Sequence, residues 1–271
     1  MPDSQVRAVV IGACGKMGRL IIKVIQETSG IVLAGATERA GHHLIGHELA
    51  ETYSAGKSGI VITDSLSKVP GAYDVLIDFT APENTVHNLK WAVFEERAIV
   101  IGTTGFSPQE REEIERIAPE TRTIFSPNMS VGVNLMFRLI AEAAQVLGND
   151  YDVEIIEAHH RMKKDAPSGT ALKMAEIVAK SLKRNLDEVA RYERKGMIGE
   201  RRREEIGIQT IRAGDIVGEH TVLFGGIGET IEFTHRALSR ENFARGAVRA
   251  AKWIVGQKKG LYDMLDVLGL K

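Results

Sequence analysis

The sequence contains a single cysteine, Cys14, among its 271 residues. One cysteine cannot form a disulfide within its own chain, and such low usage is typical of a reducing compartment. Long hydrophobic runs are also missing near the start, because the first apolar run, residues 8–11, is too short for a signal peptide or a membrane span. We therefore expect a cytoplasmic protein with no membrane partner.

Positive and negative charges nearly balance, because the chain has 35 lysines and arginines and 36 aspartates and glutamates, a formal net charge of -1. No global field attracts the chain to nucleic acid, which is not an expected partner. The charge-rich stretch 183–203 mixes both signs without an aromatic platform, which predicts a solvated loop or edge. With 44% hydrophobic residues, the composition is that of an ordinary globular protein.

Short β-branched runs alternate with amphipathic stretches in the N-terminal part of the chain. This alternation is typical of β-α-β units, in which helices cover both faces of a parallel sheet. Pro82 and a capping box at Ser107 are predicted to start two of the helices. The pattern predicts an α/β fold with a Rossmann-type doubly wound parallel sheet. Its strands are expected at 6–11, 31–37, 73–79, 98–101 and 123–125.

The pattern changes after a long helix that begins at Ser130, where we place a domain boundary. Strands are predicted at 152–158, 204–213, 218–224 and 230–237, with one long helix at 169–182. Strands that arrive mostly in succession favour an α+β second domain with a mixed or antiparallel sheet, and we expect it to be largely antiparallel. A helix at 241–255 and an apolar tail complete the chain.

Glycine is abundant, with 27 residues, and one cluster forms the turn Gly12-Ala13-Cys14-Gly15-Lys16-Met17-Gly18 after the first strand. Glycine permits positive φ and close backbone approach, so this turn can present helix N-terminal amides to a pyrophosphate. Glu38 lies 38 − 18 = 20 residues after Gly18, where a carboxylate meets the adenosine ribose. Arg39 matches a 2′-phosphate, so both NAD and NADP remain open.

A second glycine motif, Gly102-Thr103-Thr104-Gly105, directly follows the strand at 98–101. The carboxyl ends of parallel strands meet at one edge of the sheet, where ligands collect. We therefore expect this turn to lie beside the same cofactor.

The most specific segment for chemistry is residues 157–171. It offers positive charge and titratable groups, and then the helix start Ser168-Gly169-Thr170, whose backbone amides suit a carboxylate. Histidine titrates near neutrality, and a lysine can donate a proton when its pKa is lowered. An anionic substrate and proton transfer are expected here. The basic and imidazole side chains are His159, His160, Arg161, Lys163 and Lys164.

No metal is expected at these histidines. Consecutive side chains rarely face one centre, and neither a cysteine nor a second carboxylate stands at ligand spacing near His159 and His160.

Together these motifs resemble the dihydrodipicolinate reductase family, also called 4-hydroxy-tetrahydrodipicolinate reductase, of lysine and diaminopimelate biosynthesis. The resemblance spans nearly the whole chain. It implies an NADPH- or NADH-dependent reduction in which a small cyclic 4-hydroxy dicarboxylate loses water and accepts hydride, giving tetrahydrodipicolinate. The residues that carry it are Glu157-Ala158-His159-His160, Lys163, the run 165–171, the turns 12–18 and 102–105, and the run 128–133.

The resemblance also implies residue roles. His159 would be the acid/base residue and Lys163 the proton donor, with His160, Ser168, Gly169 and Thr170 holding a substrate carboxylate. Glu38 would bind the ribose and Arg39 the NADP phosphate. The dinucleotide phosphates would lie on Gly12, Ala13, Cys14, Gly15, Lys16 and Met17. The ribose and nicotinamide would lie beside Gly102, Thr103, Thr104, Ser126, Pro127, Asn128 and Met129.

Finally, the resemblance implies a homotetramer with two domains in each chain. Residues 1–130 and 241–271 would form the dinucleotide-binding domain, and residues 131–240 the substrate-binding and oligomerisation domain.

Two other functions remain open. Another two-domain NAD(P)-dependent dehydrogenase, acting on an amino acid or a sugar, would explain the turn 12–18 but not the loop 159–170. A redox sensor that binds dinucleotide without turnover would leave the proton donors unexplained.

Overall fold

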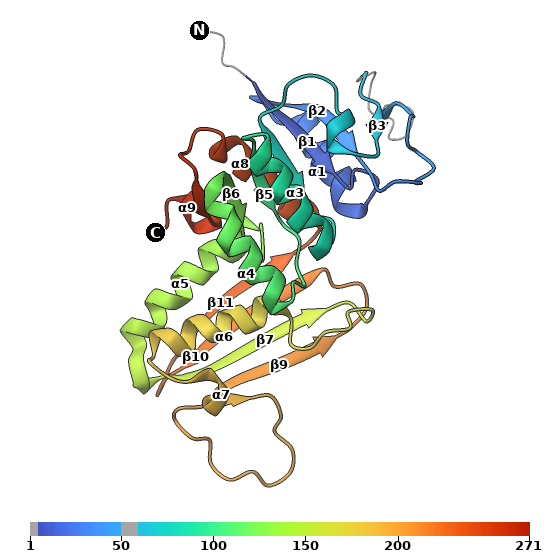
Figure 1. Ribbon diagram of the computed structural model, residues 1–271. Coiled ribbons are helices and arrows are strands. Elements are labelled where there is room, and N and C mark those ends of the chain that lie inside the picture. Colours follow the sequence, from blue (N-terminus) through green and yellow to red (C-terminus); the bar gives the residue numbers. More distant parts are fainter. Residues whose placement is uncertain (1–4, 50–58) are drawn as a thin grey trace. The chain divides into compact units, whose positions relative to one another are not determined.

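The structure is a computed structural model that describes residues 5–49 and 59–271 (Figure 1). The chain divides into two compact units, the first comprising Met1–Val131 with Arg240–Lys271 and the second Gly132–Ser239. The first unit is discontinuous in sequence, because the chain leaves it for the second unit and then returns. Each unit has its own hydrophobic core, as separate domains do.

A seven-stranded sheet forms the centre of the first unit within its described residues. The strand order is β12-β6-β5-β4-β1-β2-β3, and neighbouring strands pair in parallel. The order reverses at β1, which has β2 on one side and β4 on the other, and such a reversal creates a ligand-binding crevice. The predicted Rossmann-type sheet is confirmed. Its strands are β1 (Val6–Ile11), β2 (Ile31–Thr37), β3 (Ile62–Thr63), β4 (Val75–Asp78), β5 (Ala98–Ile101), β6 (Arg122–Phe125) and β12 (Gly260–Tyr262).

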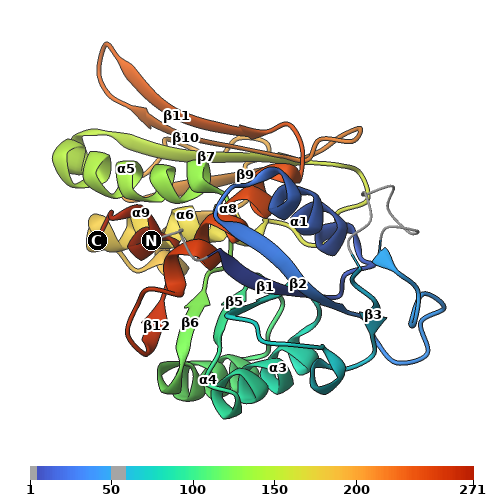
Figure 2. The ribbon, with the colours of Figure 1, turned by 90° about the horizontal axis from the view of Figure 1, so that it is seen from above.

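Helices cover both faces of this sheet (Figure 2). In β1, Ala8 and Val10 pack against α1, α8 and α9, whereas Val9 and Ile11 belong to the opposite core with α3 and α4. Strands buried on both faces are apolar throughout, which explains the continuous runs in the sequence. The helices are α1 (Lys16–Glu27), α3 (Pro82–Phe94), α4 (Pro108–Ile117), α8 (Glu241–Ile254) and α9 (Met264–Leu268).

Local sequence signals start two of these helices as predicted. Ser107 Oγ accepts a hydrogen bond from the Glu110 N–H at 3.2 Å, while the Glu110 carboxylate accepts from the Ser107 N–H at 2.7 Å. This reciprocal pair is the capping box of α4. Pro82 occupies the first turn of α3, where its missing N–H costs nothing.

The expected apolar tail is a structural part of the first unit. β12 pairs in parallel with β6 and forms an edge of the sheet, and α9 follows with Asp263 as the cap of its first turn. A three-residue strand has too little periodicity to be recognised in the sequence. The pairing with β6 decides its conformation.

The second unit, all of whose residues are described, contains a five-stranded sheet in the order β11-β10-β7-β9-β8. β10 is antiparallel to β7 and β11, but β9 is parallel to both β7 and β8. The predicted α+β unit with a mixed sheet is confirmed. The sheet is less antiparallel than expected, because a crossover through α6 brings β9 back parallel to β7. The elements are α5 (Val131–Leu147), β7 (Asp152–His159), α6 (Gly169–Ser181), α7 (Leu186–Val189), β8 (Ala190–Arg191), β9 (Ile206–Arg212), β10 (Gly218–Gly225) and β11 (Thr230–Ala237).

Among the described residues, the helical stretch Val131–Asp150 is long and apolar enough to cross a membrane by length and composition. Its inner face, which includes Met136, Phe137 and Ile140, is buried in the core of the second unit. On the outer face Arg138 and Glu142 form an ion pair at 2.8 Å. This division is that of an amphipathic core helix.

The charge-rich stretch 183–203 contains the edge strand β8, and most of its other side chains are exposed, as predicted. Arg194 donates two hydrogen bonds of 2.8 Å to the carboxylate of Glu154 on β7, and Arg201 donates to the same carboxylate at 3.2 Å. Arg201 also donates to the backbone carbonyls of Val153 and Glu205. The predicted solvated edge is therefore confirmed for most of the stretch, whereas Arg194 and Arg201 are held by Glu154, 40 and 47 residues earlier.

We expect Gly246→Ala to destabilise the first unit by about 1–3 kcal/mol or more, as overpacking does. A Cβ on Gly246 of α8 would lie 1.7 Å from the carbonyl oxygen of Met129. Urea unfolding measures the change. The control is Gly225→Ala, whose Cβ would make an ordinary 3.6 Å contact with Leu223 and should shift the free energy of unfolding by only about 0.5 kcal/mol. Equal stability of the two variants would contradict the close approach.

Candidate active site

The glycine turn between β1 and α1 depends on one positive φ and one close backbone approach. Gly12 has a φ of 71°, in the left-handed region that favours glycine. A Cβ on Gly18 would lie 2.2 Å from the carbonyl oxygen of Gly12, so only glycine lets α1 begin this close to the turn. Gly15 is the N-cap of α1 and provides no side-chain cap. The first-turn amides are therefore open to an anion such as a phosphate group.

Glu38 lies beside this turn at the end of β2. Its Oε2 accepts a hydrogen bond from the Cys14 N–H and its Oε1 accepts one from the Arg39 N–H, both at 3.0 Å. The Glu38 N–H donates to the carbonyl of Thr63 at 2.9 Å. The carboxylate is thus held at the rim of the turn, and its oxygens can still accept from the hydroxyls of a ribose.

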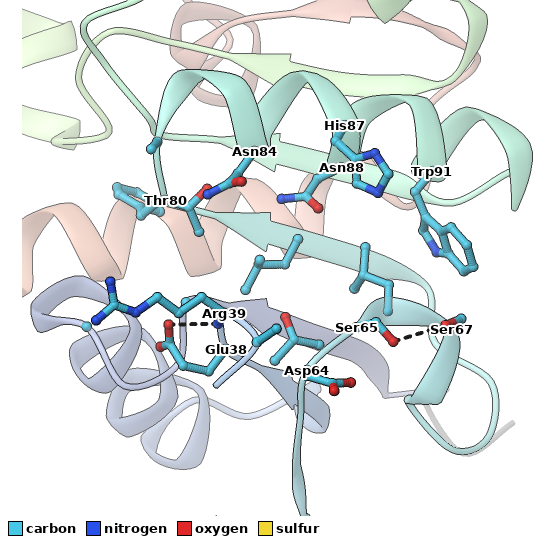
Figure 3. A pocket seen from close by; sticks show the side chains of 18 residues that line it. Glu38, Arg39, Asp64, Ser65, Ser67, Thr80, Asn84, His87, Asn88 and Trp91 are labelled. Atoms are coloured by element: carbon cyan, nitrogen blue, oxygen red, sulfur yellow. Dashed lines mark hydrogen bonds between the residues drawn. The ribbon is translucent and has the colours of Figure 1, made fainter. Parts of the chain in front are cut away.

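A cavity of about 540 Å³ opens between this rim and helix α3 (Figure 3). Gly12, Gly15, Glu38 and Arg39 line it on the side of the turn, as expected for a dinucleotide site. The opposite wall is the polar face of α3. Its labelled side chains are Asn84, His87, Asn88 and Trp91.

The α3 wall of the cavity was not expected from the sequence. Asn84, Asn88 and Trp91 recur at helical spacing directly after the strand β4, and His87 lies on the same face. A polar stripe on a helix that starts at the carboxyl edge of a parallel sheet is the signal that identifies such a wall.

Asp78, at the end of β4, ties this wall to the second glycine turn. Its Oδ1 accepts hydrogen bonds from the N–H and the hydroxyl of Thr80 at 2.9 and 2.7 Å. Its Oδ2 accepts from Asn88 at 2.9 Å, and Thr103 lies 3.5 Å from Oδ1. The buried Asp78 carboxylate therefore fixes the turn 102–105 against α3.

The other predicted cofactor residues differ from one another in burial and in the strand that they follow. Ala13 and Met129 are buried. Gly102, Thr103 and Thr104 follow β5, and Ser126, Pro127, Asn128 and Met129 follow β6, so both groups lie at the carboxyl edge that also carries the glycine turn. Cys14 is half-buried, Lys16 is exposed and Met17 is half-buried. Open helix amides, a fixed carboxylate and a cavity at one edge fit a dinucleotide.

In the second unit, one face of the sheet turns from apolar to polar toward the end of β7. Side chains that lie side by side across β7, β9 and β10 form layers on this face. The layers nearer the middle of β7 are isoleucine, valine and phenylalanine side chains that pack with α5 and α6. In the next layer Glu157 pairs with Thr210 on β9 and with His220 on β10. His159 ends β7 opposite Arg212. The candidate chemistry therefore sits on the polar end of a sheet whose other end is core.

Glu157 is completely buried and joins three parts of the second unit, namely β7, β9 and the start of α6. Arg212 donates to both of its oxygens at 2.9 and 2.8 Å. The Ser168 N–H donates to Oε1 at 3.0 Å, and the Thr210 hydroxyl donates at 3.3 Å. Burial alone would raise the pKa of Glu157, but Arg212, His159 and the Ser168 N–H hold it below its usual range. The group is therefore a carboxylate at neutral pH.

His159 Nδ1 lies 2.6 Å from Oε2 of Glu157. An ionised carboxylate only accepts hydrogen bonds, so Nδ1 carries the proton and Nε2 is left to exchange one. Burial lowers the pKa of His159; Glu157 opposes this shift, whereas Lys163 and Arg212 add to it. The imidazole is consequently neutral near pH 7 and can accept a proton.

His220 is buried beside His159, with ring centroids 5.1 Å apart in an edge-to-face arrangement. Its Nε2 lies 3.0 Å from the Ser168 hydroxyl, which itself accepts from the Ala171 N–H and caps α6. Burial lowers the pKa of His220 to about 3. This histidine stays neutral and links β10 to the start of α6.

Lys163 lies in the loop that follows β7, and its ammonium donates to both oxygens of Asp165 at 2.9 Å. This hydrogen bond holds the pKa of Asp165 below its usual range. The Lys163 N–H donates to the carbonyl of His160 at 3.1 Å, which tightens the loop. Gly169 and Thr170 open α6 directly after the capping residue Ser168.

The structure therefore brings the predicted His159, Lys163 and Ser168 to one end of the sheet. It adds partners to which the sequence assigned no role, namely Glu157, Thr210, Arg212 and His220. Their signal is the period-two alternation that puts Glu157 on the face of the buried Val153 and Ile155. Across residues 5–49 and 59–271, no group of three or more His, Cys, Asp or Glu side chains is arranged to hold a metal ion.

Two family models match the chain along almost its whole length. "Dihydrodipicolinate reductase, N-terminus" matches residues 6–129, and "Dihydrodipicolinate reductase, C-terminus" matches residues 132–268. The chain belongs to the dihydrodipicolinate reductase family. The 4-hydroxy-tetrahydrodipicolinate reductases of Syntrophus aciditrophicus and Geotalea uraniireducens are 55% and 53% identical to it over 267 residues, covering 98% of this chain and 100% of each relative.

A solved dihydrodipicolinate reductase shares this architecture. The dipicolinate-bound enzyme from Paenisporosarcina sp. TG-14 superposes with a TM-score of 0.74 at 26% identity, covering 97% of this chain and 98% of that one. An amine dehydrogenase from Mycobacterium smegmatis shares the fold, with a TM-score of 0.59 at 13% identity over 95% of this chain and 94% of that one. Membership of the dihydrodipicolinate reductase family makes this protein an oxidoreductase that uses NAD(P)H.

The neutral His220 predicts how the second unit responds to acid. Its pKa is about 3 in the folded chain against 6.5 for an unperturbed histidine, so the unfolded state takes up the proton first as the pH falls. Stability is therefore lost between about pH 6.5 and 3, by about 1.4 kcal/mol per pH unit for this group.

We expect His220→Gln to remove about this share of the slope between pH 6.5 and 5. Urea unfolding at several pH values measures it. The exposed His43 provides the control, because His43→Gln should keep the wild-type slope. If His220→Gln and wild type lose stability equally on acidification, His220 is not held neutral by the fold.

Proposed function

We propose that this protein reduces 4-hydroxy-tetrahydrodipicolinate to tetrahydrodipicolinate, with loss of water, in lysine and diaminopimelate biosynthesis. The observation that carries the proposal is the cluster of His159 and Lys163 beside the start of α6. It suits an anionic substrate that exchanges protons, and it lies in a chain whose relatives carry the name of this activity.

The two units would divide the work. Residues 1–130 and 241–271 would bind the dinucleotide, and residues 131–240 would bind the substrate and form the contacts of a homotetramer. A cytoplasmic location is part of the same proposal, since the single cysteine suits a reducing compartment. The substrate would be a small dicarboxylate.

In the first unit, the turn 12–17 would hold the two phosphates through the open first-turn amides of α1, and the fixed Glu38 carboxylate would accept from the ribose hydroxyls. Arg39 would bind the 2′-phosphate of NADPH. When bound, the reduced nicotinamide supplies the hydride. The groups that follow β5 and β6, Gly102–Thr104 and Ser126–Met129, would lie beside its ribose and ring.

In the second unit, the amides of Gly169 and Thr170 would hold one substrate carboxylate at the positive end of α6, assisted by Ser168 and His160. Lys163 would supply a proton, and His159 would exchange one at Nε2. Loss of the 4-hydroxyl as water needs a proton on the leaving oxygen, and a protonated side chain nearby provides it.

The decisive assay follows the loss of reduced-nicotinamide absorbance while dihydrodipicolinate synthase generates the labile substrate in the same cuvette. We expect rapid oxidation by the wild type, and Lys163→Ala to slow it by about 10²- to 10⁴-fold, the usual scale of general acid catalysis. Lys173→Ala is the control, because Lys173 is exposed on α6 and pairs with Glu176.

Absence of oxidation by wild type, with the coupling enzyme active and cofactor bound, would refute the proposed activity and favour another dehydrogenase or a sensor. Unchanged turnover and substrate affinity in Lys163→Ala would refute only its role.

Arg39 allows a separate test of cofactor choice. We expect Arg39→Ala to weaken NADPH binding far more than NADH binding, because only NADPH offers the phosphate that a guanidinium matches. Dissociation constants from calorimetry provide the measurement. Arg116→Ala, on the exposed side of α4 in the same unit, should change neither constant. Equal losses for both cofactors in Arg39→Ala would show that Arg39 does not select for the phosphate.

A further inference from the structure

Proton exchange at Nε2 of His159 requires that the imidazole keep one tautomer and one orientation. A histidine ring is usually fixed by the hydrogen bond that its other nitrogen makes. In this unit that bond is the 2.6 Å contact between Nδ1 and Oε2 of Glu157.

The Glu157 carboxylate cannot follow the ring, because its other contacts anchor it. Arg212 donates a hydrogen bond to each of the two oxygens, and the Ser168 N–H donates to Oε1. Arg212 is itself held, since it also donates to the backbone carbonyls of Asp165 and Ile211 at 2.7 Å. The position of the carboxylate is therefore set by β9 and the start of α6 as well as by its own strand.

The other sides of the His159 ring are also confined. The ring of His220 meets it edge to face. At the start of β10, Gly218 lacks the Cβ that would lie 3.0 Å from Nε2 of His159. The absent side chain leaves room for the ring in this one position, with Nδ1 on the carboxylate.

We propose that Glu157 is the positioning residue of this site, which holds His159 as the Nδ1–H tautomer and aims Nε2 at the substrate. The inference rests on the proposed role of His159 in proton transfer. Glu157 takes no part in the reaction itself. It acts through the ring that it orients.

A change at Glu157 has a predictable sign for the titration of His159. The groups that face this ring are Glu157 on β7, Lys163 in the following loop, Arg212 on β9 and His220 on β10. Of these, only Glu157 is negative and favours the imidazolium. Removing its charge leaves the two cations opposing protonation, so the pKa of His159 falls further.

The first test uses the wild-type protein and needs no activity. Nitrogen-15 NMR of histidine-labelled protein distinguishes the two tautomers, and comparison with His159→Gln assigns the signals of His159. We expect neutral His159 to be the Nδ1–H tautomer. The Nε2–H tautomer, or a mixture of both, would overturn the proposal whether or not the protein is the reductase.

The second test is Glu157→Gln in the coupled assay. We expect kcat to fall by up to about 10⁴-fold, the loss that follows when the carboxylate that fixes the tautomer of a catalytic histidine becomes an amide, with a smaller change in KM. The limb of the pH profile that reports His159 should move to lower pH. A reduced kcat with the limb unmoved would indicate a purely structural role and overturn the proposal.

Glu205→Gln is the matched control. Glu205 is also a buried carboxylate of the second unit held by arginines, Arg191 and Arg194 at 3.3 and 3.4 Å. Its loss should cost stability without moving the pH limb or the tautomer of His159. If both variants move the limb equally, the effect is general and not due to Glu157. If Glu157→Gln does not fold, the wild-type tautomer still decides the proposal.

Discussion

The burial of one charge, the carboxylate of Glu157, constrains three parts of the second unit at once. A buried carboxylate is costly unless charged and hydrogen-bonding partners surround it. Arg212, the Ser168 N–H and His159 are those partners, and they come from β9, the start of α6 and the end of β7. The Glu157 carboxylate therefore finds all its partners only when the strands have this register and the loop 160–167 and the beginning of α6 take these positions.

The two proposed anion sites, one in each unit, are built in different ways. In the first unit the proposed binding groups are backbone amides, and the turn requires the absence of side chains at Gly12 and Gly18. In the second unit the groups are titratable side chains on a sheet whose polar end lies next to its apolar core. The first arrangement suits a cofactor of fixed charge, and the second suits a substrate that exchanges protons.

Much of the first unit could be read from the sequence because its signals are local. The glycine turn, the Ser107 capping box and the apolar strands each depend on neighbours within a few residues, and Glu38 lies beside the turn as its spacing predicts. The failures involve distant partners. The strand β12 exists through its pairing with β6, and Arg194 and Arg201 are ordered by Glu154, about 40 residues earlier.

By itself, the sequence determined the two-domain α/β architecture and the chemical groups, because periodicity and glycine spacing are properties of the chain alone, and its motifs carried the resemblance to the family. Only the tertiary structure decided the parallel return of β9, the α3 wall of the cavity and the meeting of Glu157, Arg212 and His220. These depend on strand register and helix crossover, which bring residues more than 50 positions apart into contact. A sequence motif identifies such residues, but it does not show that they are in contact.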